Sequence, residues 1–182
     1  LSHEAAAASS LVGTTAHQIT LDCANVKKGD KVLILGGPTS VGMIAVQLAV
    51  QAGAIVYTTS SPRNTEFVQS LGGKDITIIN YRADKWWEMD LKDFDAVIDT
   101  TGEEKAWERS SNVLKPDGSF VTINSFDVGF DPNGHPPRKY AAFYCLCNKP
   151  SAQDAIAKGL EEGILKIPLV EPTYPFTEQG AK

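Results

Sequence analysis

Residues 31–49 read KVLILGGPTSVGMIAVQLA, a strand-like run joined by two glycines to a run with helical spacing of its apolar residues. A strand, a glycine turn and a helix in that order are typical of the opening of a dinucleotide-binding βαβ unit. The N-terminus of such a helix carries unpaired N–H groups and a partial positive charge. The stretch therefore predicts a site for a pyrophosphate group.

The glycine pattern departs from G-x-G-x-x-G at its second position. Gly37 and Gly42 take the first and third positions, where we expect Gly37 to allow the tight turn and Gly42 to let the helix pack closely on the sheet. Thr39 stands where a glycine normally lets the backbone approach the pyrophosphate. The hydroxyls of Thr39 and Ser40 are candidates to donate to phosphate oxygens instead. Taken alone, the stretch is also compatible with a βα turn that binds nothing.

Strand-like and helical runs continue to alternate along the chain. Strand-like runs end near residues 36, 59, 79, 99 and 124, and a sixth covers 140–147. Helices are predicted between them, over 40–52, 64–71, 83–91 and 103–114, and a last one from Ser151 to about Glu162. This alternation predicts an α/β fold with a doubly wound, parallel six-stranded sheet of the Rossmann type and right-handed crossovers. Two N-terminal helices, separated or kinked at Gly13–Ala16, precede the sheet.

The residues that follow the second strand favour NADP(H) as the ligand. An NAD-type site places an acidic residue about 20 positions beyond the first glycine, but residues 57–60 contain none. Ser60 and Arg63 stand there instead, and hydroxyl and guanidinium donors suit the dianionic 2′-phosphate of NADP(H). The competing interpretation of Arg63 is a solvated residue in a first helical turn. Tyr81, after the third strand, is either a contact of the adenine or an ordinary aromatic at a strand end.

Composition narrows the possible classes. A chain of 182 residues is one domain, or one domain with an appendage, and has room for a full core. Its net charge of −5, without a basic cluster, argues against a nucleic-acid partner. No apolar run approaches the roughly 20 residues of a membrane span, and no signal peptide opens the chain. Three cysteines, an odd number, favour a reducing compartment, so we expect a cytoplasmic protein, with an organelle matrix also open. The histidines show no metal-ligand spacing.

Taken together, four stretches resemble the medium-chain dehydrogenase/reductase superfamily, in its zinc-free quinone oxidoreductase branch. The first is Glu4–Ala16, the second is Gly29–Ile34 together with Val41–Ala49, the third is Leu114–Val121 and the fourth is Gly159–Lys166. The family usually has glycines where this chain has Thr39 and Ser40. The resemblance implies that residues 1–24 are linking helices from a catalytic domain that this sequence lacks. It implies that residues 25–182 are the dinucleotide-binding domain, truncated at its C-terminus, and that no zinc is bound.

The same resemblance implies which residues contact the cofactor. For the pyrophosphate they are Pro38, Thr39, Ser40 and Val41; for the 2′-phosphate, Ser60 and Arg63; and for the adenosine end, Tyr81. Residues facing the nicotinamide half would be Thr15, Thr100, Thr101, Gly102, Asn124, Ser125 and Phe126. No catalytic residue stands out.

The function implied is hydride transfer from NADPH to a quinone or an α,β-unsaturated carbonyl, with the chemistry residing in the cofactor. The alternative is a module that holds NADPH as a sensor or scaffold without turnover. A weaker alternative is a Rossmann-like domain for another nucleotide ligand such as S-adenosylmethionine, against which the missing acid counts.

A homodimer is also expected. Residues 140–147 read as an edge strand that is apolar on both faces, which is a liability unless the strand is paired or covered. The resemblance implies that two copies pair through this strand.

Overall fold

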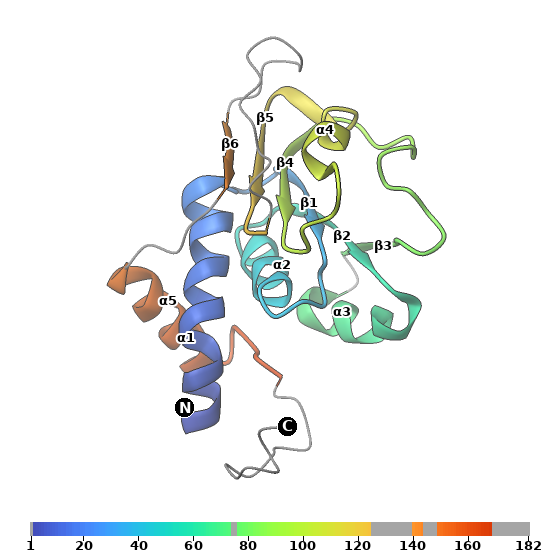
Figure 1. Cartoon of the computed structure of the whole chain (residues 1–182). Helices are drawn as coiled ribbons and strands as arrows, with labels where there is room; N and C mark the ends of the chain where they lie inside the picture. The colour runs from blue at the N-terminus through green and yellow to red at the C-terminus, as the bar shows by residue number, and fades with distance from the viewer. Residues whose placement is uncertain (1, 74–75, 125–139, 144–148, 169–182) are drawn as a thin grey trace, which may run out of the picture.

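The structure, a computed structural model, describes residues 2–73, 76–124, 140–143 and 149–168 (Figure 1). Its strands are β1 (Lys31–Leu35), β2 (Ile55–Ser60), β3 (Thr77–Asn80), β4 (Phe94–Asp99), β5 (Leu114–Thr122) and β6 (Tyr140–Phe143). They form one sheet in the order β3-β2-β1-β4-β5-β6, and every neighbouring pair is parallel. The predicted doubly wound, parallel six-stranded sheet is confirmed. Its order reverses between β1 and β4, where open α/β sheets bind ligands.

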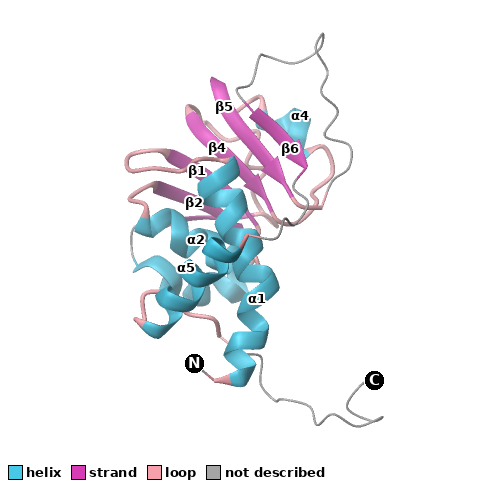
Figure 2. Ribbon diagram, turned by 90° about the vertical axis from the view of Figure 1, so that its left-hand side faces the viewer, coloured by secondary structure: helices cyan, strands magenta, loops and turns pink. Residues whose placement is uncertain are grey.

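The helical elements are α1 (His3–His17), the π-helical η1 (Gln18–Cys23), α2 (Gly42–Gln51), the 3₁₀ turn η2 (Pro62–Asn64), α3 (Thr65–Gly72), α4 (Ala106–Ser110) and α5 (Pro150–Glu161). Figures 1 and 2 show α1, α2 and α5 grouped together, with α4 apart from them beyond β4 and β5. Successive side chains of a strand point to opposite faces of the sheet, so the sheet contributes side chains to two core layers. Val32 and Ile34 of β1 enter the layer under α1, α2 and α5, while Leu33 and Leu35 enter the layer on the α4 side.

The N-terminal helices differ from the prediction, because α1 runs without interruption through Gly13. A Cβ atom at Gly13 would lie 2.7 Å from Ile156 Cγ2, so the glycine allows α5 to pack closely while the backbone stays helical. Thr14 and Thr15 donate their hydroxyl hydrogens back to Ser10 O and Leu11 O within the helix. The helical geometry changes only at Gln18, where η1 begins.

The helix predicted over 83–91 is wrong; this stretch is a series of turns. Trp86 and Trp87 are adjacent, and both belong to the core layer on the α4 side, where Trp86 is fully buried. A helix would point these adjacent side chains about 100° apart. The turns instead bury Trp86 fully and let the partly buried Trp87 pack against the same core layer.

The region after β4 also differs. Instead of a helix over 103–114 there is the short α4, because Gly102 and Lys105 have φ of 72° and 58°, values that an α-helix does not allow. Residues 115–118, predicted as a turn, lie within β5, whose register against β4 shifts between Phe94 and Ala96. Pro116 is tolerated at this irregularity. The last helix starts with Pro150 in its first turn rather than with Ser151 as its cap.

Candidate functional site

The three glycines at the turn between β1 and α2 stand at positions that have no room for a side chain. Gly36 has a φ of 86°, and a Cβ atom at Gly42 would lie 2.0 Å from the Gly36 carbonyl oxygen. At Gly37 a Cβ atom would lie 2.4 Å from Thr58 Oγ1 on β2. Gly42 thus permits the close helix approach that the sequence predicted. Gly36 is the residue of this turn whose positive φ favours glycine. At Gly37 a glycine is needed for a different reason, because β2 packs directly against it.

Thr39 holds this turn together from inside. Its Oγ1 accepts a hydrogen bond from Gly42 N at 2.9 Å and lies 2.8 Å from Thr100 Oγ1. Thr100 donates its own hydroxyl hydrogen to Leu35 O at 2.7 Å, so Thr39 is the donor to Thr100. In this structure the one hydroxyl hydrogen of Thr39 is therefore used within the fold. The contact of Thr39 with a phosphate stays a prediction.

Two backbone N–H groups at the start of α2 remain open. Within the described part of the chain, the N–H groups of Ser40 and Val41 donate to no acceptor, and Ser40 is exposed. Their position at a helix N-terminus suits an anion. Pro38 lines the cavities on both sides of the turn, and Ser40 lines the one toward α1 and α3, which has a volume of about 620 Å³.

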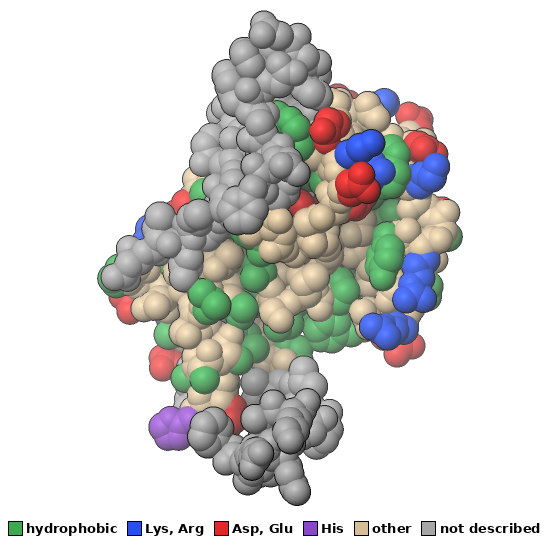
Figure 3. Space-filling view, in the orientation of Figure 1, with side chains coloured by type: hydrophobic (Ala, Val, Ile, Leu, Met, Phe, Trp, Pro, Cys, Tyr) green, Lys and Arg blue, Asp and Glu red, His purple; other side chains and the backbone are tan. Residues whose placement is uncertain are grey.

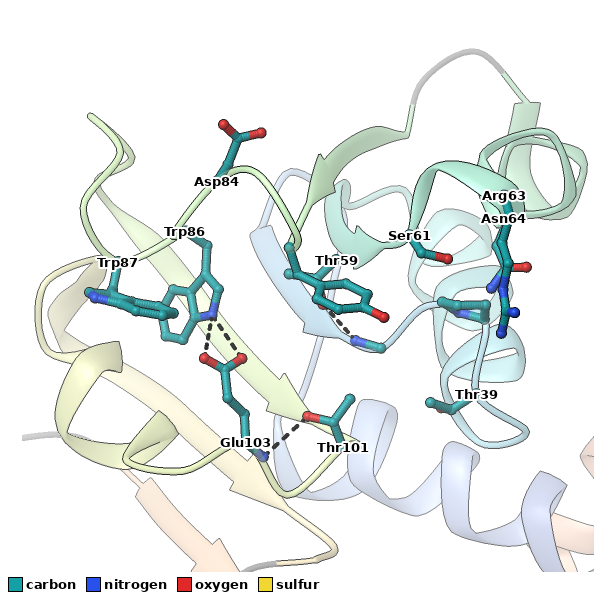
Figure 4. A pocket seen from close by; sticks show the side chains of 13 residues that line it. Thr39, Thr59, Ser61, Arg63, Asn64, Asp84, Trp86, Trp87, Thr101 and Glu103 are labelled. Atoms are coloured by element: carbon teal, nitrogen blue, oxygen red, sulfur yellow. Dashed lines mark hydrogen bonds between the residues drawn. The ribbon is translucent and has the colours of Figure 1, made fainter.

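A cavity of about 420 Å³ lies on the other side of the turn, at the carboxyl ends of β1 to β4 (Figure 4). Its size falls in the range of about 300–1,000 Å³ that is usual for small-molecule sites. The residues that line it are Gly36, Pro38, Thr39, Thr59, Ser61, Arg63, Asn64, Tyr81, Asp84, Trp86, Trp87, Thr101 and Glu103. Figure 3 shows that the middle of this face is largely uncharged, with charged side chains of both signs along its right-hand side.

One end of the cavity carries an unpaired positive charge. Arg63 is exposed, and no ion pair of its guanidinium exists among the residues that the structure describes. Ser61 and Asn64 line the cavity beside it. Ser60, the serine expected at this point, is only 1% exposed and donates its hydroxyl hydrogen to Ser61 O. Ser61, although itself only 3% exposed, lines the cavity, whereas Ser60 does not. The contact of Ser60 with the 2′-phosphate stays a prediction.

The other end is aromatic and is organised by Glu103. Trp86 Nε1 donates to Glu103 Oε2 at 3.1 Å and to Oε1 at 3.3 Å (Figure 4). Arg109 Nη1 donates to Glu103 Oε1 at 2.9 Å, and its guanidinium lies 3.7 Å from the centre of the Trp87 ring. Sequence reasoning missed these four residues; the one signal was the position of Glu103 directly after the Thr100–Gly102 strand end. Tyr81 also lines the cavity and is 54% exposed.

The loop after β4 is fixed by Asp99, which is fully buried. Its Oδ1 accepts from Thr101 N, Thr101 Oγ1 and Gly102 N, and its Oδ2 accepts from Thr122 Oγ1. Asn124 Nδ2 donates to Thr100 O at 2.8 Å, which joins this loop to the end of β5. Of the residues expected near the nicotinamide, Thr100, Thr101, Gly102 and Asn124 are therefore brought together.

Three other expected nicotinamide contacts are not placed at this loop. Thr15 lies on α1, is buried and donates to Leu11 O, and it lines neither cavity. Ser125 and Phe126 lie outside the described residues. Their roles stay predictions.

The profile of the zinc-binding dehydrogenase family matches residues 40–151, which hold α2 and most of the residues of this cavity. The chain belongs to the zinc-binding dehydrogenase family. This confirms the expected superfamily. Among solved structures, a quinone oxidoreductase from Coxiella burnetii is 31% identical, with a TM-score of 0.74 over 87% of this chain and 49% of the relative. The CurK enoyl reductase is 28% identical, with a TM-score of 0.75 over 98% of this chain and 57% of the relative.

A curated relative extends the comparison to larger proteins. Mycoketide-CoA synthase of Mycobacterium tuberculosis is 33% identical over 150 residues, which are 78% of this chain and 4% of the synthase. The chain thus spans about half or less of the proteins that it matches, and their other parts have no counterpart in it.

The family description names zinc. Zinc sites in proteins use three or four Cys, His or carboxylate ligands. No three such side chains lie together in residues 2–73, 76–124 and 149–168, so these residues do not fit a zinc ion. That the branch is zinc-free stays a prediction. None of the helices in the described ranges has the length and apolarity needed to cross a bilayer.

Proposed function

We propose that this chain is the NADP(H)-binding domain of an oxidoreductase that passes a hydride from NADPH to a quinone or an α,β-unsaturated carbonyl. The observation that carries the proposal is the unpaired Arg63 at the mouth of a cavity whose β2 end has no acidic residue. A ribose 2′-hydroxyl is normally held by an acid at this place, whereas a 2′-phosphate needs cationic and hydroxyl donors. Arg63 and Ser61 supply both kinds of donor.

The proposal also assigns positions to the pyrophosphate and the adenosine of the cofactor, supported by the geometry of the turn. The free N–H groups of Ser40 and Val41 would hold the pyrophosphate. The adenosine would occupy the 420 Å³ cavity beside Tyr81. The hydride transfer itself is chemistry of the bound nicotinamide, and the residues of this chain bind and orient the cofactor. The acceptor class is proposed from the quinone and enoyl reductase relatives, because the chain spans only part of those proteins.

We further propose that residues 1–24 connect this domain to a catalytic domain outside the sequence. In support, α1 and η1 form one continuous helical segment ahead of β1, and the chain covers 49% of the quinone oxidoreductase relative. Residues 25–182 would then be the cofactor domain itself.

Arg63→Ala tests the cofactor assignment. Calorimetric titration of the chain should give tighter binding of NADPH than of NADH. Loss of charge-assisted hydrogen bonds to a phosphate costs about 1.5–3 kcal/mol, so the variant should weaken NADPH binding about 10- to 100-fold and leave NADH binding unchanged. Arg82→Ala is the matched control, because Arg82 is exposed but lies outside the cavity. Equal weakening of NADPH binding by both variants would contradict a specific role for Arg63.

A homodimer through the last strand is also proposed. Among the residues that the structure describes, β6 is the edge of the sheet, and one side of its backbone has no neighbouring strand there. Residues 144–147 of the expected strand lie outside the described residues. Sedimentation velocity at micromolar concentration should give the mass of two chains, and a proline at Ala142 should shift it toward one. A single species with the mass of one chain would contradict the proposed homodimer.

A further inference from the structure

Glu103 lies at the end of the cavity opposite Arg63. In Figure 4 the labelled Arg63 and Asn64 stand on one side, and Trp86, Trp87 and Glu103 stand on the other. The carboxylate of Glu103 is held in place by two donors, Trp86 Nε1 and Arg109 Nη1. Trp86 is fully buried, so this carboxylate is anchored to the core rather than free to rotate in solvent.

The held carboxylate retains acceptor capacity. An ionised carboxylate has about four acceptor sites, and the two donors leave some of them open. The Glu103 side chain is 26% exposed and lines the cavity, so a ligand there can reach it. Arg109 offsets its negative charge, which reduces repulsion of a phosphate-bearing ligand elsewhere in the cavity. Glu103 therefore offers the cavity a fixed acceptor and no hydrogen to donate.

The cofactor assignment leaves one part of the ligand for this end. If Ser40 and Val41 hold the pyrophosphate and Arg63 holds the 2′-phosphate, the remaining space beside Tyr81, Trp86 and Glu103 is left for the base. Adenine carries a 6-amino group, which donates hydrogen bonds, at the edge farthest from its ribose. A 6-oxo purine presents a carbonyl oxygen at the same position, and two acceptors facing each other lose a hydrogen bond and repel.

We propose, building on the NADP(H) function above, that Glu103 accepts a hydrogen bond from the 6-amino group of adenine and makes the site select 6-amino over 6-oxo purine dinucleotides. Trp86 and Arg109 are the positioning residues that hold the carboxylate for this contact. A purely structural Glu103 would stabilise the loop after β4 but would not distinguish the two bases.

The test compares NADPH with reduced nicotinamide hypoxanthine dinucleotide phosphate, which differs from it by an oxo group in place of the 6-amino group. Calorimetric titration of the unaltered chain should give NADPH a dissociation constant about tenfold lower or more. In Glu103→Gln the amide can both donate and accept, so the ratio should fall to within about threefold. Glu104→Gln removes the same charge from the neighbouring residue, which is exposed and outside the cavity, and should keep the original ratio.

Three other outcomes would contradict the role of Glu103 or the NADP(H) assignment. Equal affinity of the unaltered chain for both dinucleotides overturns the proposal, and this comparison needs no variant to fold. If Glu103→Gln weakens both ligands alike and keeps their ratio, Glu103 is a structural residue only. Binding of neither dinucleotide overturns the NADP(H) assignment and this inference with it, whereas tight but equal binding leaves the NADP(H) assignment standing.

Discussion

Gly42→Ala should lower the free energy of unfolding by about 3 kcal/mol and abolish cofactor binding. A Cβ atom at this position would lie 2.0 Å from the carbonyl oxygen of Gly36, which is backbone and cannot rotate away. The start of α2 must then move off the turn, and forced backbone shifts of this kind cost about 1–3 kcal/mol or more. The shift also breaks the hydrogen bond from Gly42 N to Thr39 Oγ1 and displaces the N–H groups of Ser40 and Val41.

Thermal unfolding measures the first effect, because about 3 kcal/mol corresponds to roughly 6–12 °C in a domain of this size. Calorimetric titration with NADPH measures the second. Gly159→Ala is the control: it adds the same methyl group to a helix, but its Cβ atom meets the flexible end of Leu165 at 2.8 Å. We expect that variant to stay within about 1 kcal/mol of the unaltered protein. A Gly42→Ala protein with unchanged unfolding and binding would show that the close approach is not required.

Trp86→Ala should cost more stability, about 3–5 kcal/mol, because a fully buried indole is lost and the space is not refilled. Trp86 also packs edge-to-face on Trp87 with ring centres 5.5 Å apart, and it donates to Glu103. The variant therefore removes one wall of the cavity and one of the two anchors of the Glu103 carboxylate.

Chemical denaturation of the variant measures this loss, and Trp86→Phe separates its two causes. Phenylalanine keeps a buried ring but has no N–H group, so it should cost only about 1–2 kcal/mol, with Arg109 still holding Glu103. Trp87→Ala should also cost less than Trp86→Ala, since Trp87 is only partly buried. A Trp86→Ala loss below about 1 kcal/mol would show that the indole is not part of the core.

Much of the fold could be predicted because its signals are local. The apolar runs of β1 and β4 are continuous, since both faces of a parallel sheet are covered, and the helical spacing of α2 follows directly after the glycines. Alternation of such runs is enough to predict a doubly wound parallel sheet. The absence of an acidic residue from the end of β2 can likewise be read from the sequence alone. The sequence by itself thus determined the sheet, the turn and the class of ligand that the β2 end favours.

Only the tertiary structure decided how individual side chains are used. The hydroxyl of Thr39, a predicted phosphate contact, lies 2.8 Å from the hydroxyl of Thr100, which is 61 positions away in the chain. Trp86 and Glu103 read as parts of two separate helices, yet burial of the indole joins them in one cavity wall. Which groups form a hydrogen bond depends on which donors and acceptors lie close together in the folded chain. Contacts between residues far apart in sequence therefore determined which groups donate and which accept these hydrogen bonds.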